Sequence, residues 1–197
     1  MKHHFLKKSF QTTHSFFNHR FTRAAFHNTH PKNNVFTFDN YIRSMETFEI
    51  PNGVNEIGEN AFFGCSSFKS IIIPDSVTVI NEGAFAHCTS LTSISIPKSV
   101  SKIHGAAFYG CTSLRSIHIS EGLFEIGKNA FYGCPSLTSI MMPDSVSKIG
   151  INAFKNCSNL KQITSNKQDL FDEHQFDDID NIEFLNHLSS KCQSTMS

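Results

Sequence analysis

The chain has 197 residues, of which 39% are hydrophobic, and its formal net charge is zero. These values fit one soluble domain with flanking segments, and they predict no nucleic-acid partner, which would call for a strongly basic surface. No stretch reaches the ~18–20 apolar residues of a membrane helix, so we expect no membrane insertion.

The two ends of the chain carry opposite charge. Residues 1–44 hold seven Lys/Arg against one acid, and residues 166–197 hold seven acids against two Lys. Such blocks are typically solvated flanks. Residues 1–35, rich in His and Phe, are expected to form a disordered head, because their histidines lack acidic partners and no apolar run follows the basic start as in a secretory signal. The sequence alone therefore predicts a cytoplasmic chain.

Residues 36–50 are predicted to cap the N-terminal end of the core. Met45, Phe48 and Ile50 fall at positions equivalent to those of the repeats that follow, and Phe36 and Phe38 precede them. A repeat stack with an open end would expose its core to water, so a capping segment is required.

Residues 51–165 repeat with a strict period of 23. The period is seen in columns of cysteine, alanine, phenylalanine and isoleucine; the cysteines are Cys65, Cys88, Cys111, Cys134 and Cys157. A fixed period of this length predicts one small unit stacked on copies of itself, and hence a solenoid of about five full repeats.

One repeat, residues 91–113, illustrates the expected unit. Ile94 and Ile96 alternate with Ser95, which predicts a strand with one buried face in a parallel sheet, and a proline follows the strand. The segment from Ala107 to Cys111 is predicted to form a short helical turn. Eight columns are predicted to build the core, and in this repeat they are Val100, Ile103, Ala107, Phe108, Cys111, Leu114, Ile117 and Ile119.

Two columns in the turns contain glycine, with only Asn or His as substitutes. The first column is Gly58, Asn81, His104, Gly127 and Gly150. The second column is Gly64, His87, Gly110, Gly133 and Asn156. These residue types tolerate positive φ best, so left-handed backbone is predicted at both columns, which gives His87 and His104 a structural role. Three asparagines are placed to cap the helical turns, namely Asn60, Asn129 and Asn152.

Residues 166–190 form an acidic segment that is predicted to cap the other end. Ile179, Ile182, Leu185 and Leu188 recur every three residues, which predicts a capping helix that starts near Asp177 or Asp178. Residues 191–197 are expected to be a disordered tail.

The cysteine column predicts buried free thiols rather than disulfides or a zinc site. Zinc sites need cysteines two to four residues apart, and five cysteines in one column cannot all pair. Only Cys192, in the tail, is expected to be reactive.

Since no nucleophile elbow, phosphate loop or triad spacing is visible, we expect neither catalysis nor a cofactor nor a metal.

The outward side chains of the strands form the candidate binding surface. Three columns read Ile72, Ser95, His118, Met141, Thr164; Ser70, Ser93, Ser116, Ser139, Gln162; and Lys69, Thr92, Arg115, Thr138, Lys161. The first column varies between repeats while the core columns barely do, and repeat proteins present binding surfaces in this way. The predicted site is Lys69, Ile72, Thr92, Ser95, Arg115, His118, Thr138 and Met141. The alternative is that these residues only keep the sheet soluble.

The unit at residues 88–111, CTSLTSISIPKSVSKIHGAAFYGC, closely resembles the BspA-type leucine-rich repeat, and the resemblance covers about residues 45–165. It implies a right-handed solenoid with a parallel sheet on one face, no catalytic residues, and a surface-antigen-like location on bacterial or protist cells. It also implies adhesion to a host surface or matrix protein.

The sequence therefore predicts a non-enzymatic module that binds a protein through the solvent-facing side of its sheet. Two alternatives stay open. One is an intracellular scaffold or assembly protein whose caps or tails make the contacts, and the other is a truncated copy from a repeat family without a separate function.

Overall fold

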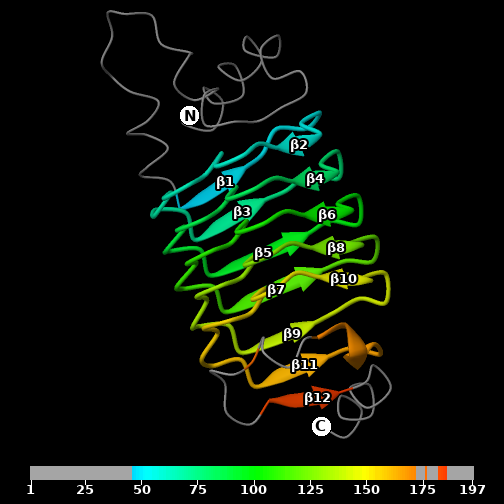
Figure 1. Cartoon of the computed structure of the whole chain (residues 1–197). Helices are drawn as coiled ribbons and strands as arrows, with labels where there is room; N and C mark the ends of the chain where they lie inside the picture. The colour runs from blue at the N-terminus through cyan, green and yellow to red at the C-terminus, as the bar shows by residue number, and fades with distance from the viewer. Residues whose placement is uncertain (1–45, 172–175, 177–181, 186–197) are drawn as a thin grey trace, which may run out of the picture.

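In the computed structural model the described residues are 46–171, 176 and 182–185, and they wind into a parallel β-solenoid of about six turns (Figure 1). Each full turn contains a longer strand, a corner, a two-residue strand on another face, and a run of tight turns that leads into the next longer strand. The predicted repeat solenoid is confirmed. The predicted head, residues 1–35, and tail, residues 191–197, lie outside the described residues.

The longer strands stack in parallel on one side of the solenoid, which we call the long-strand face. They are β1 (Thr47–Glu49), β3 (Ser70–Ile72), β5 (Ser93–Ile96), β7 (Ser116–Ile119), β9 (Ser139–Met141), β11 (Gln162–Thr164) and β12 (Glu183–Leu185). The first four form one sheet and the last three another, with β7 and β9 in contact. The register follows the sequence period, since Ser93 pairs with Ser116 and Ile94 with Ile117.

A second parallel sheet lies on another side, the short-strand face, where the sequence pattern predicted core residues but no strand. Its five strands are β2 (Glu56–Ile57), β4 (Val79–Ile80), β6 (Lys102–Ile103), β8 (Glu125–Ile126) and β10 (Lys148–Ile149). In β6, Ile103 is fully buried and Lys102 is half-buried. A strand of two residues is too short to show alternation, which is why this sheet could not be predicted.

The segments between each short strand and the next long strand are tight turns rather than the predicted helical turns. We call them the turn segments: residues 58–65, 81–88, 104–111, 127–134 and 150–157. In the first, the Ala61 and Phe63 amides donate three residues back, at 3.2 and 3.1 Å, while the Phe62 amide donates to Ala84 of the next turn at 2.7 Å. An α-helix needs every amide for its own i−4 carbonyl, so amides shared with a neighbouring turn exclude it.

The left-handed backbone was predicted correctly at one column and wrongly at the other. Gly64, His87, Gly110, Gly133 and Asn156 all have positive φ, between 58 and 68°. The column from Gly58 to Gly150 does not, and His104 therefore has no left-handed explanation. Positive φ occurs instead two residues later, at Asn60, Gly83, Ala106, Asn129 and Asn152, with φ of 52–62°. The three asparagines thus adopt left-handed backbone and cap no helix.

Glycine at 127 and 150 is explained by close approach of neighbouring backbone. A Cβ on Gly127 would lie 2.6 Å from the His104 carbonyl carbon, and one on Gly150 would lie 2.4 Å from the Lys128 nitrogen. Real Cβ atoms do not approach backbone so closely, so these two positions accommodate only glycine in the observed stacking.

The core is a set of columns that run along the solenoid axis. All eight predicted columns are buried in the repeat that illustrates them, at 7% exposure or less. Phe62, Phe85, Phe108, Phe131 and Phe154 stack with neighbouring ring centroids 5.1–5.5 Å apart and planes within 13° of parallel. Each buried phenylalanine contributes a large apolar area, so this column anchors the packing of successive turns.

The C-terminal end of the core is covered by a strand and an aromatic cluster where a helix was predicted. Residues 183–185 form β12, which pairs with β11, and a 3₁₀ turn, η1 (Gln168–Leu170), precedes the cluster. The Phe171 and Phe176 rings lie 6.4 and 6.5 Å from the Phe154 ring, and both contact Phe184. A further parallel strand satisfies the edge of β11, which a helix could not do. The expected helix start at Asp177 or Asp178, together with Ile179 and Leu188, lies outside the described residues.

At the N-terminal end, Phe48 and Ile50 are buried as predicted for the first turn. Phe48 belongs to β1 and packs against Phe62 and Phe68, with ring centroids 5.5 and 5.4 Å apart. Residues 36–45 of the predicted cap, including Phe36, Phe38 and Met45, lie outside the described residues. The boundaries of the predicted segments stay predictions.

Candidate binding surface

The long-strand face presents the outward side chains that the sequence singled out. In β5 and β7, Ile94, Ile96, Ile117 and Ile119 point into the core, and the residues between them are exposed. Because the strands pair in register, equivalent side chains stand in rows across the sheet, about 4.8 Å apart. The predicted alternation therefore places the candidate residues on one continuous surface.

Seven of the eight predicted site residues are exposed. They are Lys69, Ile72, Ser95, Arg115, His118, Thr138 and Met141. Thr92 is half-buried, and its hydroxyl donates to the Lys69 carbonyl oxygen at 3.0 Å. This hydrogen bond joins the two turns just before β3 and β5 begin. Thr164, placed in the same outward column as Ile72, is buried at 5% exposure, which corrects that column: it ends at Met141.

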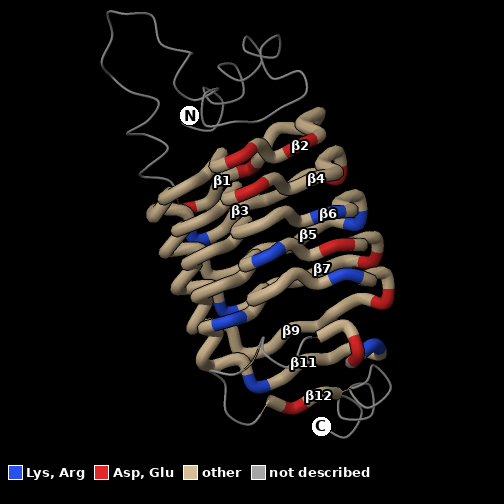
Figure 2. Tube along the Cα trace, viewed as in Figure 1, with Lys and Arg blue, Asp and Glu red and all other residues tan. Residues whose placement is uncertain are grey.

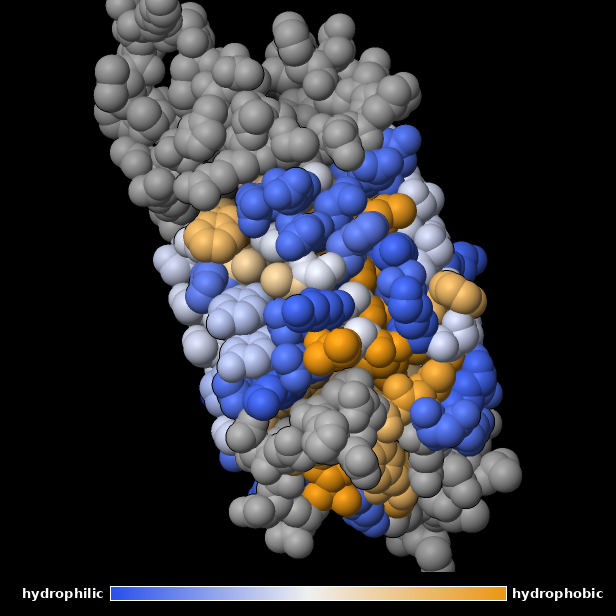
Figure 3. All heavy atoms as spheres, in the orientation of Figure 1, coloured by the Kyte–Doolittle hydropathy of each residue, from blue (hydrophilic) through white to orange (hydrophobic). Residues whose placement is uncertain are grey.

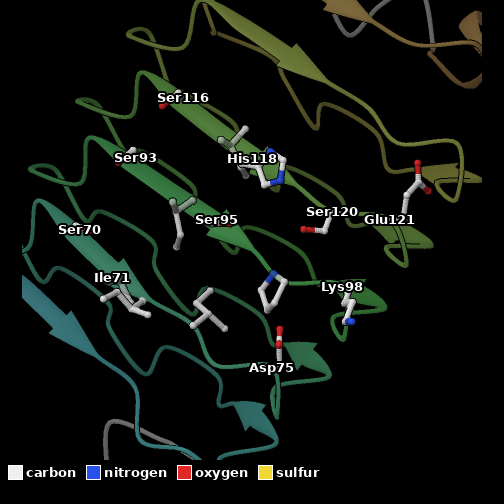
Figure 4. A pocket seen from close by; sticks show the side chains of 15 residues that line it. Ser70, Ile71, Asp75, Ser93, Ser95, Lys98, Ser116, His118, Ser120 and Glu121 are labelled. Atoms are coloured by element: carbon white, nitrogen blue, oxygen red, sulfur yellow. The ribbon is translucent and has the colours of Figure 1, made fainter. Parts of the chain in front are cut away.

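An open groove of about 900 Å³ crosses β3, β5 and β7 on this face (Figure 4). Ile72, Ser95 and His118 line it together with the serine row Ser70, Ser93 and Ser116. The other five predicted residues do not line the groove: Lys69, Thr92, Arg115 and Thr138 come just before the strands, and Met141 belongs to β9. The structure therefore gathers three of the eight predicted residues around one concavity.

The wall of the groove at the C-terminal ends of the strands was missed by sequence reasoning. It includes Asp75, Lys98, Ser120 and Glu121, which follow β3, β5 and β7 (Figure 4). A period of 23 relates Asp75, Lys98 and Glu121, so the repeat phase contained a signal for this charged wall. In Figure 2 such charged corners line the right-hand edge of the solenoid.

The basic side of the long-strand face, where the strands begin, is partly neutralised. The Lys69 ammonium lies 2.6 Å from the Glu46 carboxylate, and both side chains are more than half exposed. An exposed pair of this kind contributes about 0–1 kcal/mol to stability but cancels the charge locally. Within residues 46–171, Arg115 and Lys161 have no ion pair, so they give this side its net positive charge.

The short-strand face carries charges that neutralise one another. The Glu125 carboxylate lies 3.1 Å from the ammonium groups of Lys102 and Lys148, one in each neighbouring strand. Hydrogen bonds from these two lysines hold the pKa of Glu125 below its ordinary value. This face therefore offers a partner less uncompensated charge than the long-strand face.

Cys88 and Cys111 are the chemically quiet members of the cysteine column. The Sγ atoms of Cys88, Cys111, Cys134 and Cys157 lie 3.1–3.3 Å from a phenylalanine carbonyl oxygen of the preceding turn. Burial raises the pKa of Cys88 and raises that of Cys111 to about 12, so neither forms the reactive thiolate near neutrality. Cys65 departs from the prediction, because it is only half-buried.

Two histidines of the turn segments were given a structural role. His87 has φ of 58°, and its ring packs against Phe63 and Tyr109, both 5.3 Å away between centroids.

Across the described ranges, no group of three His, Cys, Asp or Glu side chains is placed to hold a metal ion. No helix in the same ranges is long and apolar enough to cross a membrane.

Large exposed hydrophobic side chains are few in the described part of the chain. They are Phe63, Ile72, Phe124, Met141 and Ile151, at 40–63% exposure. On the face drawn in Figure 3, hydrophilic residues dominate and hydrophobic ones gather toward the C-terminal half. Ile72 and Met141 belong to the long-strand face, where they add apolar contact to a mainly polar surface.

Comparison with solved structures finds the same fold in bacterial leucine-rich-repeat proteins. A leucine-rich-repeat protein from T. pallidum is 26% identical with a TM-score of 0.62, over 78% of this chain and 84% of that one. A leucine-rich-repeat protein from Bacteroides ovatus is also 26% identical, with a TM-score of 0.58, over 74% of this chain and 34% of that one. The pneumococcal vaccine antigen PcpA, 21% identical with a TM-score of 0.56, matches 73% of this chain and 42% of its own length.

Comparison with curated proteins gives no significant match. The family model described as the BspA type leucine-rich repeat region, in contrast, matches six copies over residues 32–161 and 78–194. These ranges contain every long strand, every short strand and all five turn segments described above. The chain therefore belongs to the BspA-type leucine-rich-repeat family, whose repeats suggest a protein-interaction module.

Proposed function

We propose that this chain is a non-enzymatic module that binds another protein through the long-strand face, at the groove over β3, β5 and β7. The observation that carries the proposal is the contrast between columns. The core columns repeat nearly the same residue in every turn, whereas the outward column reads Ile72, Ser95, His118 and Met141. A regular scaffold with a varied outer column is the usual form of a repeat-protein binding surface.

The chemistry of the surface suits a polypeptide partner. Ser70, Ser93 and Ser116 offer hydroxyl donors and acceptors, and Ile72 and Met141 offer apolar contact at about half exposure. Charged groups of both signs, such as Arg115 and Glu121, border these serine and apolar side chains. Protein interfaces combine apolar anchors with a polar, hydrogen-bonding rim in this way.

By family resemblance the proposed partner is a host surface or matrix protein, which makes the module an adhesin. The Ser70, Ser93 and Ser116 row extends across only a few strands at about 4.8 Å each, so one copy presents a short surface. Modest affinity is expected unless several copies act together on a cell or bead.

The proposal predicts that truncating Ile72, Ser95 and His118, which line the groove, to alanine weakens binding and leaves the fold intact. All three are exposed, so the melting temperature of the triple variant should stay within about 2 °C of the parent. Binding is measured by biolayer interferometry on immobilised laminin and collagen, with the chain displayed in several copies on beads.

Lys148→Ala on the short-strand face is the matched control and should bind like the parent. The adhesin proposal is contradicted if neither matrix protein retains the beads. If binding occurs and the triple variant binds equally well, the long-strand face is the wrong surface.

A further inference from the structure

A stripe of aromatic rings lies on the outside of the turn segments, away from the groove. Ala61 and Phe62 of the first turn segment point into the core, whereas Phe63 is exposed at 40%. From Phe63 the contacts continue to His87, Tyr109 and Tyr132, with successive ring centroids 5.3, 5.3 and 5.0 Å apart.

The stripe is continuous because the ring of His87 takes the place of the aromatic residue that is missing in the second turn. The column of Phe63, Tyr109 and Tyr132 has Ala86 in the second turn, and Ala86 is buried. The left-handed backbone at His87 turns its side chain outward, so that its ring sits between those of Phe63 and Tyr109. At the far end the Asn156 amide donates to the Tyr132 hydroxyl at 2.7 Å. The four rings thus form an aromatic strip about 15 Å long, in which Phe63 and His87 are exposed and Tyr109 and Tyr132 are half-buried.

A column of charges runs beside this strip and changes sign along the axis. Glu59 and Glu82 are exposed in the first two turn segments, Gly105 stands in the third, and Lys128 is exposed in the fourth. The strip's own column ends in Lys155, in the fifth turn. None of these four charged side chains has an ion pair with another residue of the described ranges.

This order of charges is complementary to itself under a two-fold rotation. If a second copy lies antiparallel, with the third turn segments facing each other, Glu82 of each copy faces Lys128 of the other. The same rotation sets Glu59 opposite Ile151 and Phe63 opposite Lys155, because these residues stand in the first and fifth turns of their columns, and it brings the Tyr109 rings together at the axis. A parallel arrangement would instead place like charges together. Since a two-fold interface uses the same patch on both subunits, self-complementarity is the property that it requires.

We infer that the turn face of this chain, defined by Glu59, Phe63, Glu82, His87, Tyr109, Lys128, Tyr132 and Lys155, docks onto a second copy of the chain in antiparallel orientation. Tyrosine and phenylalanine are enriched in protein interfaces, and here they are flanked by unpaired charges of both signs. A face of five turns buries less than the ~800 Å² per partner of a stable interface, so the dimer is weak and reversible. The long-strand faces of both copies stay open.

The test is sedimentation equilibrium of the full chain over a wide range of protein concentration at low salt. The parent chain is expected to show a monomer–dimer equilibrium, weakened by added salt. Glu82→Lys alone and Lys128→Glu alone each place like charges opposite one another, and each should raise the dissociation constant about tenfold. The double variant, Glu82→Lys with Lys128→Glu, restores opposite charges and should return the dissociation constant to the parent value.

Lys161→Glu on the long-strand side is the matched control, and it should leave the equilibrium unchanged. The inference is overturned if the parent stays monomeric at millimolar concentration. It is equally overturned if dimers form and the single charge variants do not weaken them, or if the double variant fails to recover. Circular dichroism melting of each variant, whose altered side chains are all exposed, verifies that the fold is kept.

Discussion

At the scale of single residues, the backbone conformation of one column decides which side chains suit the turns. Five turn segments place a residue at φ of 52–62°, and four of them use Asn or Gly there. The fifth uses Ala106, whose φ is 53°. The left-handed region costs an L-residue with a Cβ about 1–2 kcal/mol. Ala106 is therefore the strained member of its column.

Ala106→Gly is predicted to increase the free energy of unfolding by about 1 kcal/mol, since it removes this strain at a small cost in unfolded-state entropy. Urea denaturation followed by circular dichroism measures the change. The control is Ala107→Gly, because Ala107 is fully buried and has no positive φ, and it should lose about 1 kcal/mol. A loss of stability in Ala106→Gly would show that the strain assignment is wrong.

The same residues show how far sequence alone could go. Glycine, asparagine and histidine were all interpreted as markers of positive φ, which was right for His87 and wrong for His104. Gly127 and Gly150 are required instead by backbone packed 2.4–2.6 Å from where their Cβ would lie, and this contact depends on how turns stack. A single column of residue types cannot distinguish these two reasons for glycine.

At the scale of the elements, the turn segments enclose a ladder of thiols that differ in access. Cys88, Cys111 and Cys134 are fully buried, whereas Cys65 is half-buried. Burial raises the pKa of the Cys88 and Cys111 thiols, and the hydrogen bond with Cys157 together with burial raises that of Cys134. Only the thiolate attacks a disulfide reagent, so both access and pKa disfavour reaction of the enclosed thiols at pH 8.

Native protein treated at pH 8 with an aromatic disulfide reagent should therefore be modified at Cys65 at least about tenfold faster than at these three positions. Peptide mass spectrometry after timed quenching gives the rate at each site. In denaturant the rates should become equal. If the reagent modifies Cys111 rapidly in the folded protein, the ladder is not enclosed and the packing described here is incorrect.

The elements also show where prediction from the sequence fell short. The long strands were found because alternating residues such as Ile94, Ser95 and Ile96 span a whole strand. The short strands have two residues each and give no period to detect. Residues 183–185 were predicted to lie in a helix from apolar residues spaced by three, but they pair with the free edge of β11 as a strand. The tertiary position of a segment overrode its local pattern.

At the scale of the whole molecule, the repeat gives the chain three kinds of surface with different properties. The short-strand face neutralises its charge through Lys102, Glu125 and Lys148. The turn face combines the aromatic strip with charges suited to a second copy. The long-strand face has the varied column and the groove. The outward column of this candidate site could be predicted from the repeat phase. The same phase relates Asp75, Lys98 and Glu121, but that these corners close a groove over β3, β5 and β7 depends on the path of the chain after each strand, which the period does not give.

Hydrogen–deuterium exchange with a matrix protein bound to the chain shows whether the partner covers the long-strand face. Binding there should slow exchange in the segments of β3, β5 and β7 and in the corners that hold Asp75, Lys98 and Glu121. No change is expected in β6, β8 and β10. Protection confined to the short strands or the turn segments, with β3, β5 and β7 unaffected, would contradict binding at the long-strand face.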